Sequence, residues 1–407
     1  MMNKRINGLG SYFLLCALCG PLLLSQSAQA QLDIDIAYIK LQQEHRPVLS
    51  NILPEASDAG QRGADLALQD SNTTGRFLKQ SFHLKTDISD TPEETLTRIQ
   101  SRYAQGIRLF IFDLPAGALK TASAWLNKAS LNSVPADDVL IFNTRAKENA
   151  LRVDQCISNV LHTIPSRAML ADALAQWLKE KRLNKWLLIK GSTEGDHAYA
   201  QSMQRAAKRF GHKIVAEKQW SFDTDLRRLA QKEMPLFTQT EEYDVVVVAD
   251  EQGDFGEYVL YNTWYPRPVV GTQGLTPVAW HRVVEQWGAA QLQSRFEKLT
   301  GRWMNSQDYA SWLAVRSIAE AVTRTNTTNT TTLKQYIISD KFELAGFKGR
   351  KLNFRTWSGQ LRQPIPLVHP RSLVSQSPQA GFLHPSSELD TLGFDAPESQ
   401  CRLAERF

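Results

Sequence analysis

The sequence lacks the motifs that most enzyme chemistry requires. No Gly-x-Gly-x-x-Gly or Gly-x-x-x-x-Gly-Lys-Ser/Thr phosphate loop occurs, and no Gly-x-Ser-x-Gly segment offers a hydrolase nucleophile. No His-Glu-x-x-His or Cys-x-x-Cys spacing gathers metal ligands, and the histidines are scattered along the chain. We therefore predict that the chain is not an enzyme and has no catalytic residue, no metal site and no cofactor.

The chain also lacks a strong excess of either charge. Its 407 residues include 47 Lys and Arg against 42 Asp and Glu, which gives a net charge of +5. Nucleic acids and anionic membrane surfaces are recognised by clustered positive charge, so neither is an expected partner. Hydrophobic residues make up 42% of the chain, which is ordinary for a globular protein of roughly two domains.

The first 30 residues have the features of a cleaved export signal. Lys4 and Arg5 precede an apolar stretch at 12–24, and residues 27–30 supply the small side chains of a cleavage site. A membrane anchor is the alternative, but the apolar stretch is short, and no second one of about 20 residues follows. Cleavage after Ala30 predicts a periplasmic protein whose mature chain does not insert into a membrane.

Few cysteines remain after that cleavage. Of the four in the sequence, Cys156 and Cys401 lie in the mature chain. Two thiols in an oxidising compartment can pair, and this pair would tie the end of the chain to its middle. Two buried, unpaired thiols are the alternative, because the sequence does not give the distance between their Cα atoms.

Short apolar runs alternate with amphipathic stretches over residues 33–271. The clearest strand-like runs are 33–39, 81–86, 108–114, 139–142, 186–190 and 243–249. This alternation predicts an α/β fold in which mostly parallel sheets carry helices on both faces. A mostly helical region is expected at 278–325. Residues 371–407 are rich in Pro, Ser and Gln, which predicts an extended C-terminal tail.

Small, polar and Gly residues follow several of the expected strands. The segments concerned are 113–117, 143–146, 191–194, 250–253 and 271–274. Ligands of open parallel sheets bind beyond the carboxyl ends of the strands, where backbone N–H groups favour anionic groups. The same composition is typical of any strand-to-helix turn, so each segment is a candidate for binding or for structure alone.

An ordered series of motifs resembles one protein family. The motifs are Asp-Ala-Gly-Gln-Arg-Gly-Ala-Asp at 58–65, Asp-Ile-Ser-Asp at 87–90, Asp-His-Ala-Tyr-Ala-Gln-Ser-Met-Gln at 196–204 and Ala-Gly-Phe-Lys-Gly at 345–349. In this order they resemble the periplasmic substrate-binding proteins of branched-chain amino acid ABC transporters. The resemblance covers about residues 33–368 and implies a two-lobed type I periplasmic-binding fold.

The resemblance also implies domain limits and ligand contacts. Lobe 1 would comprise residues 31–160 and 273–332, and lobe 2 residues 161–272 and 333–370, with the ligand held in a cleft between them. The implied ligand-binding residues are Gly117, through its backbone, and Thr144, Arg145, Thr193, Asp250 and Gln273, through their side chains.

The implied pocket departs from the family pattern. Leu114-Pro115-Ala116-Gly117 stands where a Ser is usual, the neutral Gln273 stands near the acid that holds the ligand amine, and Gly195-Asp196 stands where a Tyr is usual. The residues with which the family binds an α-amino acid are therefore not present in the implied pocket. Arg145 predicts pairing with an anionic group instead.

The tail narrows the resemblance. Residues 389–401 resemble a segment of the binding proteins grouped with PQQ-dependent alcohol dehydrogenase systems. The implied function is the solute-binding component of an ABC importer, which delivers a small ligand to an inner-membrane permease and ATPase, with a link to such an alcohol oxidation system. A non-transport sensor or assembly protein that uses the same fold is the alternative.

Overall fold

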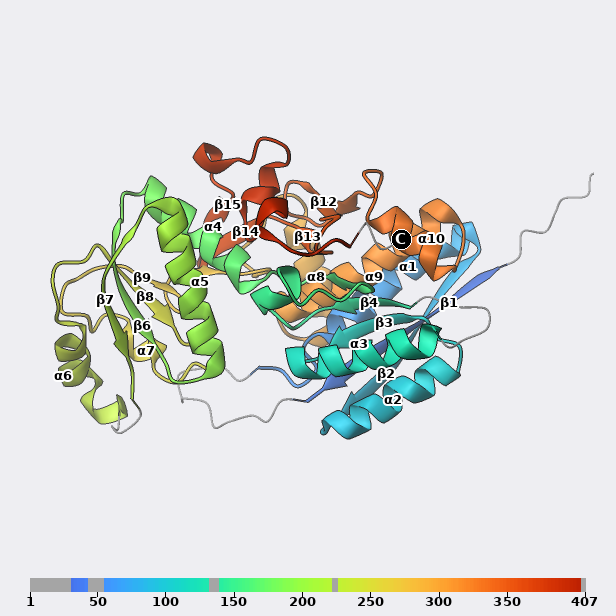
Figure 1. The fold of residues 1–407 in the computed structure, drawn as a ribbon, viewed down its shortest axis with the longest axis horizontal. Helices are drawn as coiled ribbons and strands as arrows, with labels where there is room; N and C mark the ends of the chain where they lie inside the picture. Colours follow the sequence, from blue (N-terminus) through green and yellow to red (C-terminus); the bar gives the residue numbers. More distant parts are fainter. Residues whose placement is uncertain (1–30, 43–54, 132–138, 222–225, 404–407) are drawn as a thin grey trace, which may run out of the picture.

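The first of two parallel sheets forms the centre of lobe 1 (Figure 1). The computed structural model describes residues 31–42, 55–131, 139–221 and 226–403, so the expected export signal at 1–30 lies outside the described residues. The strand order is β2-β1-β3-β4-β5, and all neighbours are parallel. The strands are β1 (Leu32–Leu41), β2 (Gln80–Ser89), β3 (Leu109–Asp113), β4 (Leu140–Asn143) and β5 (Val160–His162).

Helices cover both faces of the lobe 1 sheet. On one face lie α1 (Gln61–Leu78) and α9 (Ser306–Thr325), and on the other lie α2 (Pro92–Ala104) and α3 (Ala116–Leu131). Alternation along β1 explains this arrangement, since Ile36 packs toward the first pair and Ala37 toward the second. The start of α2 is fixed by Thr91, whose side chain accepts a hydrogen bond from the Glu94 amide.

Lobe 2 repeats this three-layer arrangement around a sheet of order β7-β6-β8-β9, again all parallel. Its strands are β6 (Lys185–Lys190), β7 (Lys213–Gln219), β8 (Val245–Ala249) and β9 (Val269–Gly271). Its helices are α4 (Arg167–Glu180) and α5 (Glu194–Phe210) on one face and α6 (Leu226–Thr238) and α7 (Gly256–Val259) on the other. The prediction of parallel α/β sheets with helices on both faces is therefore confirmed.

The rest of the chain is divided between the lobes differently from the expectation. The remaining helices are α8 (Ala289–Thr300), α10 (Thr330–Ile337), and the short 3-10 turns η1 (Asn149–Arg152), η2 (Ala380–Phe382), η3 (Glu388–Thr391) and η4 (Ala396–Glu398). The remaining strands are β10 (Thr276–Pro277), β11 (Leu344–Ala345), β12 (Lys351–Phe354), β13 (Leu361–Arg362), β14 (Ile365–His369) and β15 (Ser372–Ser377).

Buried contacts show on which core residues 333–370 pack. Leu333, Leu352 and Leu361 pack in the core of lobe 1, although residues 333–370 were expected in lobe 2. The chain enters the lobe 2 core at Ile365, where β14 pairs with β10 and β15 and packs on α4. The cause is tertiary: the apolar side chains of 333–361 cover the face of the lobe 1 sheet that α9 also covers.

The chain passes between the two cores three times before its C-terminal segment. It passes from Ile164 to Met169, from Leu275 to Ala279 and from Leu361 to Ile365. In each passage a residue of one buried core is followed within a few positions by a residue of the other. These short connections are the type that can act as a hinge.

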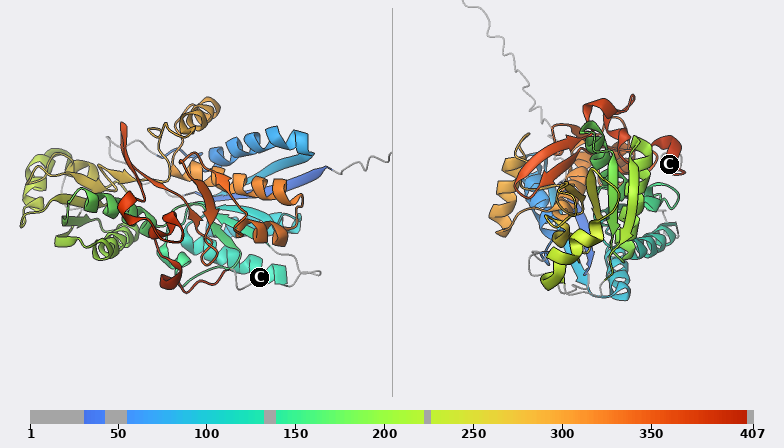
Figure 2. Two further views of the ribbon diagram at one scale, coloured as in Figure 1. Left: turned by 90° about the horizontal axis from the view of Figure 1, so that it is seen from above. Right: turned by 90° about the vertical axis from the view of Figure 1, so that its left-hand side faces the viewer.

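The segment expected as an extended tail, 371–407, is packed instead over its described part. Strand β15 forms an antiparallel pair with β14, and the segment then runs along one side of the molecule, across both lobes (Figure 2). Leu389 and Leu392 are buried, and Cys401 forms a disulfide with Cys156, with Cα atoms 5.6 Å apart. Composition alone was misleading here, because a few buried side chains and one covalent bond order a polar segment.

Candidate functional site

The carboxyl ends of the parallel strands are the expected place for a ligand, and in lobe 1 a polar cluster occupies that place. Its centre is Asp113, the last residue of β3, which is fully buried. The Tyr38 hydroxyl donates to the Asp113 carboxylate at 2.7 Å, and the Gln307 amide also donates to it. Lys40 Nζ and an Arg145 guanidinium nitrogen lie 3.8 and 3.9 Å from its oxygens. We call these five residues the Asp113 cluster.

Electrostatics keep the Asp113 cluster together. Burial raises the pKa of the Asp113 carboxyl, and the positive charges of Lys40 and Arg145 oppose that shift. Burial also raises the pKa of Tyr38 well above its ordinary value, with the Asp113 charge adding to the effect. Tyr38 therefore stays protonated and donates its hydrogen bond.

The chain before α1 closes over this cluster. Lys40 Nζ donates to the backbone oxygens of Ser57 and Ala59 at 2.9 and 2.7 Å. Gly60 has a left-handed backbone with φ of 84°, and a Cβ there would lie 2.8 Å from a carboxylate oxygen of Asp113. Only glycine fits this position without displacing the cluster.

A small cavity remains beside the Asp113 cluster. It holds about 20 Å³ and is lined by Lys40, Gln42, Glu55, Ala56, Ser57, Arg145 and Gln307. This volume is about that needed for one water molecule, far below the roughly 300 Å³ of a typical small-molecule site. Lobe 1 can thus offer a polar surface to a ligand here, but it does not enclose one by itself.

The three predicted lobe 1 residues have different environments. Thr144 is fully buried, and its hydroxyl donates to the Phe112 carbonyl at 3.2 Å, so it is part of the sheet end. Arg145 is half-buried and donates to the Leu41 carbonyl at 2.7 Å. Gly117 is exposed in the first turn of α3, with open space where a Cβ would stand. Arg145 and Gly117 therefore reach the surface, and Thr144 does not.

The two predicted lobe 2 residues hold local structure. Thr193 is the N-cap of α5, where its hydroxyl accepts from the Asp196 amide at 3.2 Å and its own amide donates to Asp196. The Asp250 carboxylate is buried and accepts from the amides of Phe255 and Gly256 at 2.9 and 2.6 Å. Burial raises the pKa of Asp250, and these amides oppose the shift. Both side chains have partners that a ligand would have to displace.

Gln273, expected at the crossing, lies between β9 and β10. Its side chain is partly exposed and packs against Gly256, where an added Cβ would overlap its Cγ atom. Three of the six predicted residues lie near a strand end and are accessible to solvent: Gly117, Arg145 and Gln273. A fourth, Thr193, is half-buried and caps α5.

Direct contacts between the lobes were not predicted from the sequence. Arg167, at the start of α4, donates to Glu251 of lobe 2 at 2.7 Å and to Glu148 of lobe 1 at 3.2 Å. Asn149 of lobe 1 donates to the Ser202 hydroxyl of α5 at 2.9 Å. No local pattern marks these residues, since each contact depends on how the two lobes are oriented.

Two further properties concern the described residues only. Within 31–42, 55–131, 139–221 and 226–403, no three His, Cys, Asp or Glu residues are grouped so that they could hold a metal ion. Among the helices of those ranges, none combines the length and the apolar character needed to cross a membrane.

Comparison with known proteins rests on structure. No protein-family model and no curated protein sequence matches the chain. The fold is similar to the branched-chain amino acid ABC transporter ligand-binding protein of Burkholderia xenovorans, with a TM-score of 0.67 and 14% identity over 92% of this chain and 100% of that one. It is equally similar to an ABC transporter substrate-binding protein of Sphaerobacter thermophilus, with a TM-score of 0.67 and 16% identity over 89% and 100%.

A third similar structure contains a ligand. It is an ABC transporter substrate-binding protein of Desulfitobacterium hafniense in complex with Leu, with a TM-score of 0.63 and 17% identity over 85% of this chain and 99% of that one. These likenesses confirm the predicted type I periplasmic-binding fold. The narrower resemblance to proteins of PQQ-dependent alcohol dehydrogenase systems stays a prediction.

Proposed function

We propose that this chain is the periplasmic solute-binding component of an ABC importer. The observation that carries the proposal is the shared two-lobed fold, which spans 89–92% of this chain and the whole length of two ABC transporter binding proteins. A ligand that touches both lobes binds the closed arrangement better than the open one and so shifts the hinge equilibrium. The closed protein would then meet an inner-membrane permease and its ATPase.

The ligand we propose carries an anionic group and is not an α-amino acid. Thr144 and Asp250 are buried and bonded within the protein, and the neutral Gln273 stands where a carboxylate would hold an amine. Arg145 is a cation at the lobe 1 strand ends that is also partly exposed. A guanidinium binds carboxylates and phosphates strongly through paired hydrogen bonds. A ligand linked to PQQ-dependent alcohol oxidation fits this proposal and rests on the tail resemblance at 389–401.

Native mass spectrometry of protein purified without refolding tests this function first. We expect a bound small molecule, and small carboxylates, phosphates and free amino acids are then compared for the rise in melting temperature that each causes. The importer proposal would be contradicted if the purified protein carries no bound small molecule and none of these compounds raises its melting temperature. Stabilisation by amino acids alone would contradict the anionic ligand class.

Substitution of Arg145 tests the site. Arg145→Gln should weaken binding of the anionic ligand by roughly tenfold or more, since a hydrogen bond to a charged group contributes about 1.5–3 kcal/mol. Arg145→Glu should abolish binding, although it brings a second carboxylate toward Asp113. Arg98→Gln, on the exposed face of α2, is the matched control and should bind as the parent does. Unchanged affinity in Arg145→Gln would show that the ligand lies elsewhere.

A non-transport sensor or assembly protein is the second candidate. It is favoured by the direct contacts of the lobes through Arg167 and Asn149, and by the internal hydrogen bonds of three polar residues that were expected to face a ligand. In that case the protein would be isolated with an empty cleft and in a stable complex with a protein partner. Affinity purification of the exported protein, followed by native mass spectrometry, distinguishes the two candidates.

A further inference from the structure

The C-terminal segment 389–403 touches both lobes. We propose that this segment, which we call the strap, is a covalently anchored restraint that holds the two lobes in one relative orientation. It provides a fourth passage between the lobes, because Leu392 is buried in the lobe 2 core and Leu403 in the lobe 1 core. The inference concerns lobe motion and does not depend on which ligand, if any, the protein binds.

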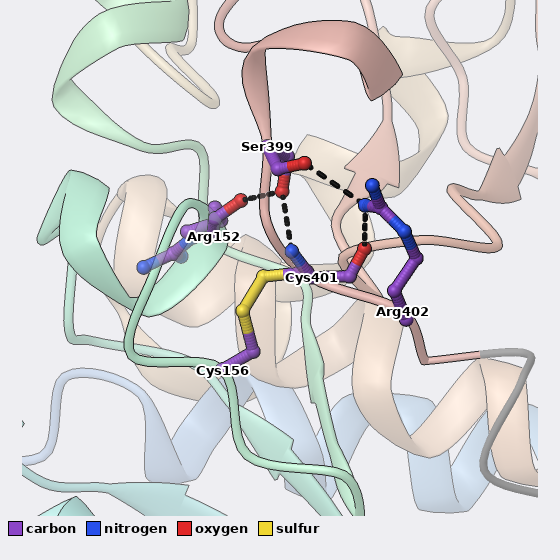
Figure 3. Close-up of a disulfide and its surroundings, with 5 residues drawn as sticks. All are labelled: Arg152, Cys156, Ser399, Cys401 and Arg402. Atoms are coloured by element: carbon purple, nitrogen blue, oxygen red, sulfur yellow. Dashed lines mark hydrogen bonds between the residues drawn. A yellow bond between two sulfur atoms is a disulfide. The ribbon is translucent and has the colours of Figure 1, made fainter.

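The end of the strap is anchored on lobe 1 (Figure 3). Cys401 forms the disulfide with Cys156, which follows η1 and precedes β5 of the lobe 1 sheet. The Ser399 hydroxyl donates to the Arg152 carbonyl at 2.8 Å and accepts from the Cys401 amide at 3.1 Å. Leu403 is nearly fully buried. Covalent, polar and apolar contacts therefore fix this end together.

The start of the strap is also anchored on lobe 1. The Asp390 carboxylate accepts from Arg355 at 2.9 Å and from Arg362 at 2.8 Å, and both arginines belong to the β12–β13 region of lobe 1. The Arg355 guanidinium also donates to the Leu392 carbonyl at 2.7 Å. Because Arg355 and Asp390 are both nearly fully buried, this ion pair is shielded from solvent and salt.

The middle of the strap is anchored on lobe 2. The Gly393 amide donates to the Asp172 carboxylate of α4 at 2.8 Å. The Gly393 carbonyl accepts from Arg205 and Arg209 of α5 at 3.1 and 2.6 Å, and both arginines also pair with Asp172. Gly393 has φ of 84°, and a Cβ there would lie 2.8 Å from the Met169 side chain. This position is therefore built for close approach of the backbone.

The spacing of these anchors restricts the hinge. Asp390 binds lobe 1 and Gly393 binds lobe 2, three positions later in the chain, so the two lobes can separate here by no more than a few ångströms before one contact breaks. Cys401 then returns the chain to lobe 1. A lobe motion that separates these two anchors by more than this must therefore break either the Asp390 or the Gly393 contacts.

Interlobe distances measured by spin labels test the strap. Labels at Lys128→Cys on α3 and Lys208→Cys on α5 place one exposed probe on each lobe. We expect a narrow distance distribution in the full-length protein. A variant with Cys156→Ser, Cys401→Ser and Asp390→Asn, which removes the disulfide and the ion pair that hold the strap on lobe 1, should show a broader distribution with longer distances. Identical distributions in the two proteins would overturn the proposal.

A control and a second measurement complete the test. The matched control is Lys351→Gln, which removes one exposed ion pair within lobe 1 and should leave the distribution unchanged. Amide hydrogen exchange of the unaltered protein needs no variant. The amides of Gly393 and Leu403 should be protected as strongly as those of the neighbouring helices. Exchange at the rate of an unstructured chain would overturn the proposal even if the strap variant failed to fold.

Discussion

The buried ion pair between Arg355 and Asp390 gives the sharpest prediction for stability. The Asp390→Asn substitution keeps the size of the side chain and removes its charge. It removes the counter-charge that Arg355, with only 2% of its side chain exposed, shares with the neighbouring Arg362, and leaves only the weaker effect of Asp395 on Arg355. The other donors of Arg355 remain bonded to backbone oxygens of Leu389 and Leu392, so the arginine cannot move easily into solvent.

The magnitude follows from the distance and the burial. Two unit charges 2.9 Å apart attract by about 6 kcal/mol at an effective dielectric constant of about 20, and desolvation of both groups offsets part of this. Removal of one partner of a buried pair typically costs about 3–5 kcal/mol, because the other charge stays buried without compensation. We expect a loss in this range for Asp390→Asn.

Urea unfolding followed by circular dichroism measures this loss. Glu343→Gln is the matched control, since it also neutralises one carboxylate of an ion pair, but Glu343 and its partner Lys351 are about half or more exposed. The control should change the free energy of unfolding by less than about 1 kcal/mol. A cost for Asp390→Asn that is no larger than this would refute the reasoning. Arg355→Met combined with Asp390→Asn should be less damaging than the two single losses added together.

Two further predictions concern pH and helix packing. Burial lowers the pKa of His212, which stacks on Trp186, to about 4. Below pH 6.5 the unfolded chain therefore binds a proton at His212 more readily than the folded chain does, so this residue lowers the free energy of unfolding as the pH falls from 6.5 to 4. In His212→Gln, thermal unfolding should show a loss of stability over that pH range that is smaller by about 1 kcal/mol, a figure reduced for the partial exposure of the side chain. Gly63→Ala would place a Cβ against the Asp308 carbonyl of α9 and should lower the free energy of unfolding, measured in urea, by about 1–3 kcal/mol. Gly117→Ala, which has open space around the added Cβ, is the control and should not lower it. Equal effects of the two substitutions would contradict the packing argument.

The elements that the sequence predicts well are those set by local physics. The run Val245–Ala249 is apolar throughout and forms the fully buried strand β8. The cap at Thr91 marks the start of α2 within one residue, because its hydroxyl bonds an amide three positions away. Gly211, with φ of 70°, marks the end of α5 in the same way. Burial patterns and caps depend on a few neighbouring residues, so they can be read without the fold.

The errors come from contacts between residues far apart in the sequence. The polar segment around Asp390 was expected to be extended, because nothing near it shows that Arg355 lies beside it in the fold. The apolar residues of 333–361 fit either lobe by composition, and in the fold they pack in the lobe 1 core with α9. The ligand contacts expected of Thr144 and Asp250 stay predictions, but both side chains already bond backbone groups, Thr144 in the neighbouring strand β3 and Asp250 in the turn into α7.

The internal hydrogen bonds of these residues indicate which side chains at the strand ends could select a ligand. A hydroxyl or carboxylate after a buried strand can bind a ligand or cap the next helix. If a capping group turns to a ligand instead, the backbone amides that it leaves unpaired cost about 1–3 kcal/mol. Thr193 and Asp250 already cap α5 and the turn into α7. If the protein binds a ligand, its discrimination should therefore reside in side chains without a capping role, and Gln273, next to a passage between the lobes, is one of them.

If the protein closes on a ligand, the strap should affect the affinity for that ligand. If closure on a ligand must break contacts of Asp390 or Gly393, the observed affinity is reduced by the fraction of molecules that are free to close. Release of the strap by Cys156→Ser, Cys401→Ser and Asp390→Asn would then increase affinity. If the lobe orientation that the strap holds is instead the one that binds the ligand, release of the strap should lower affinity. The released lobes then adopt further orientations, and binding must restrict them to one. Titration of the released and full-length proteins with the same ligand decides between these two mechanisms, and equal affinities would show that lobe orientation and binding are not coupled.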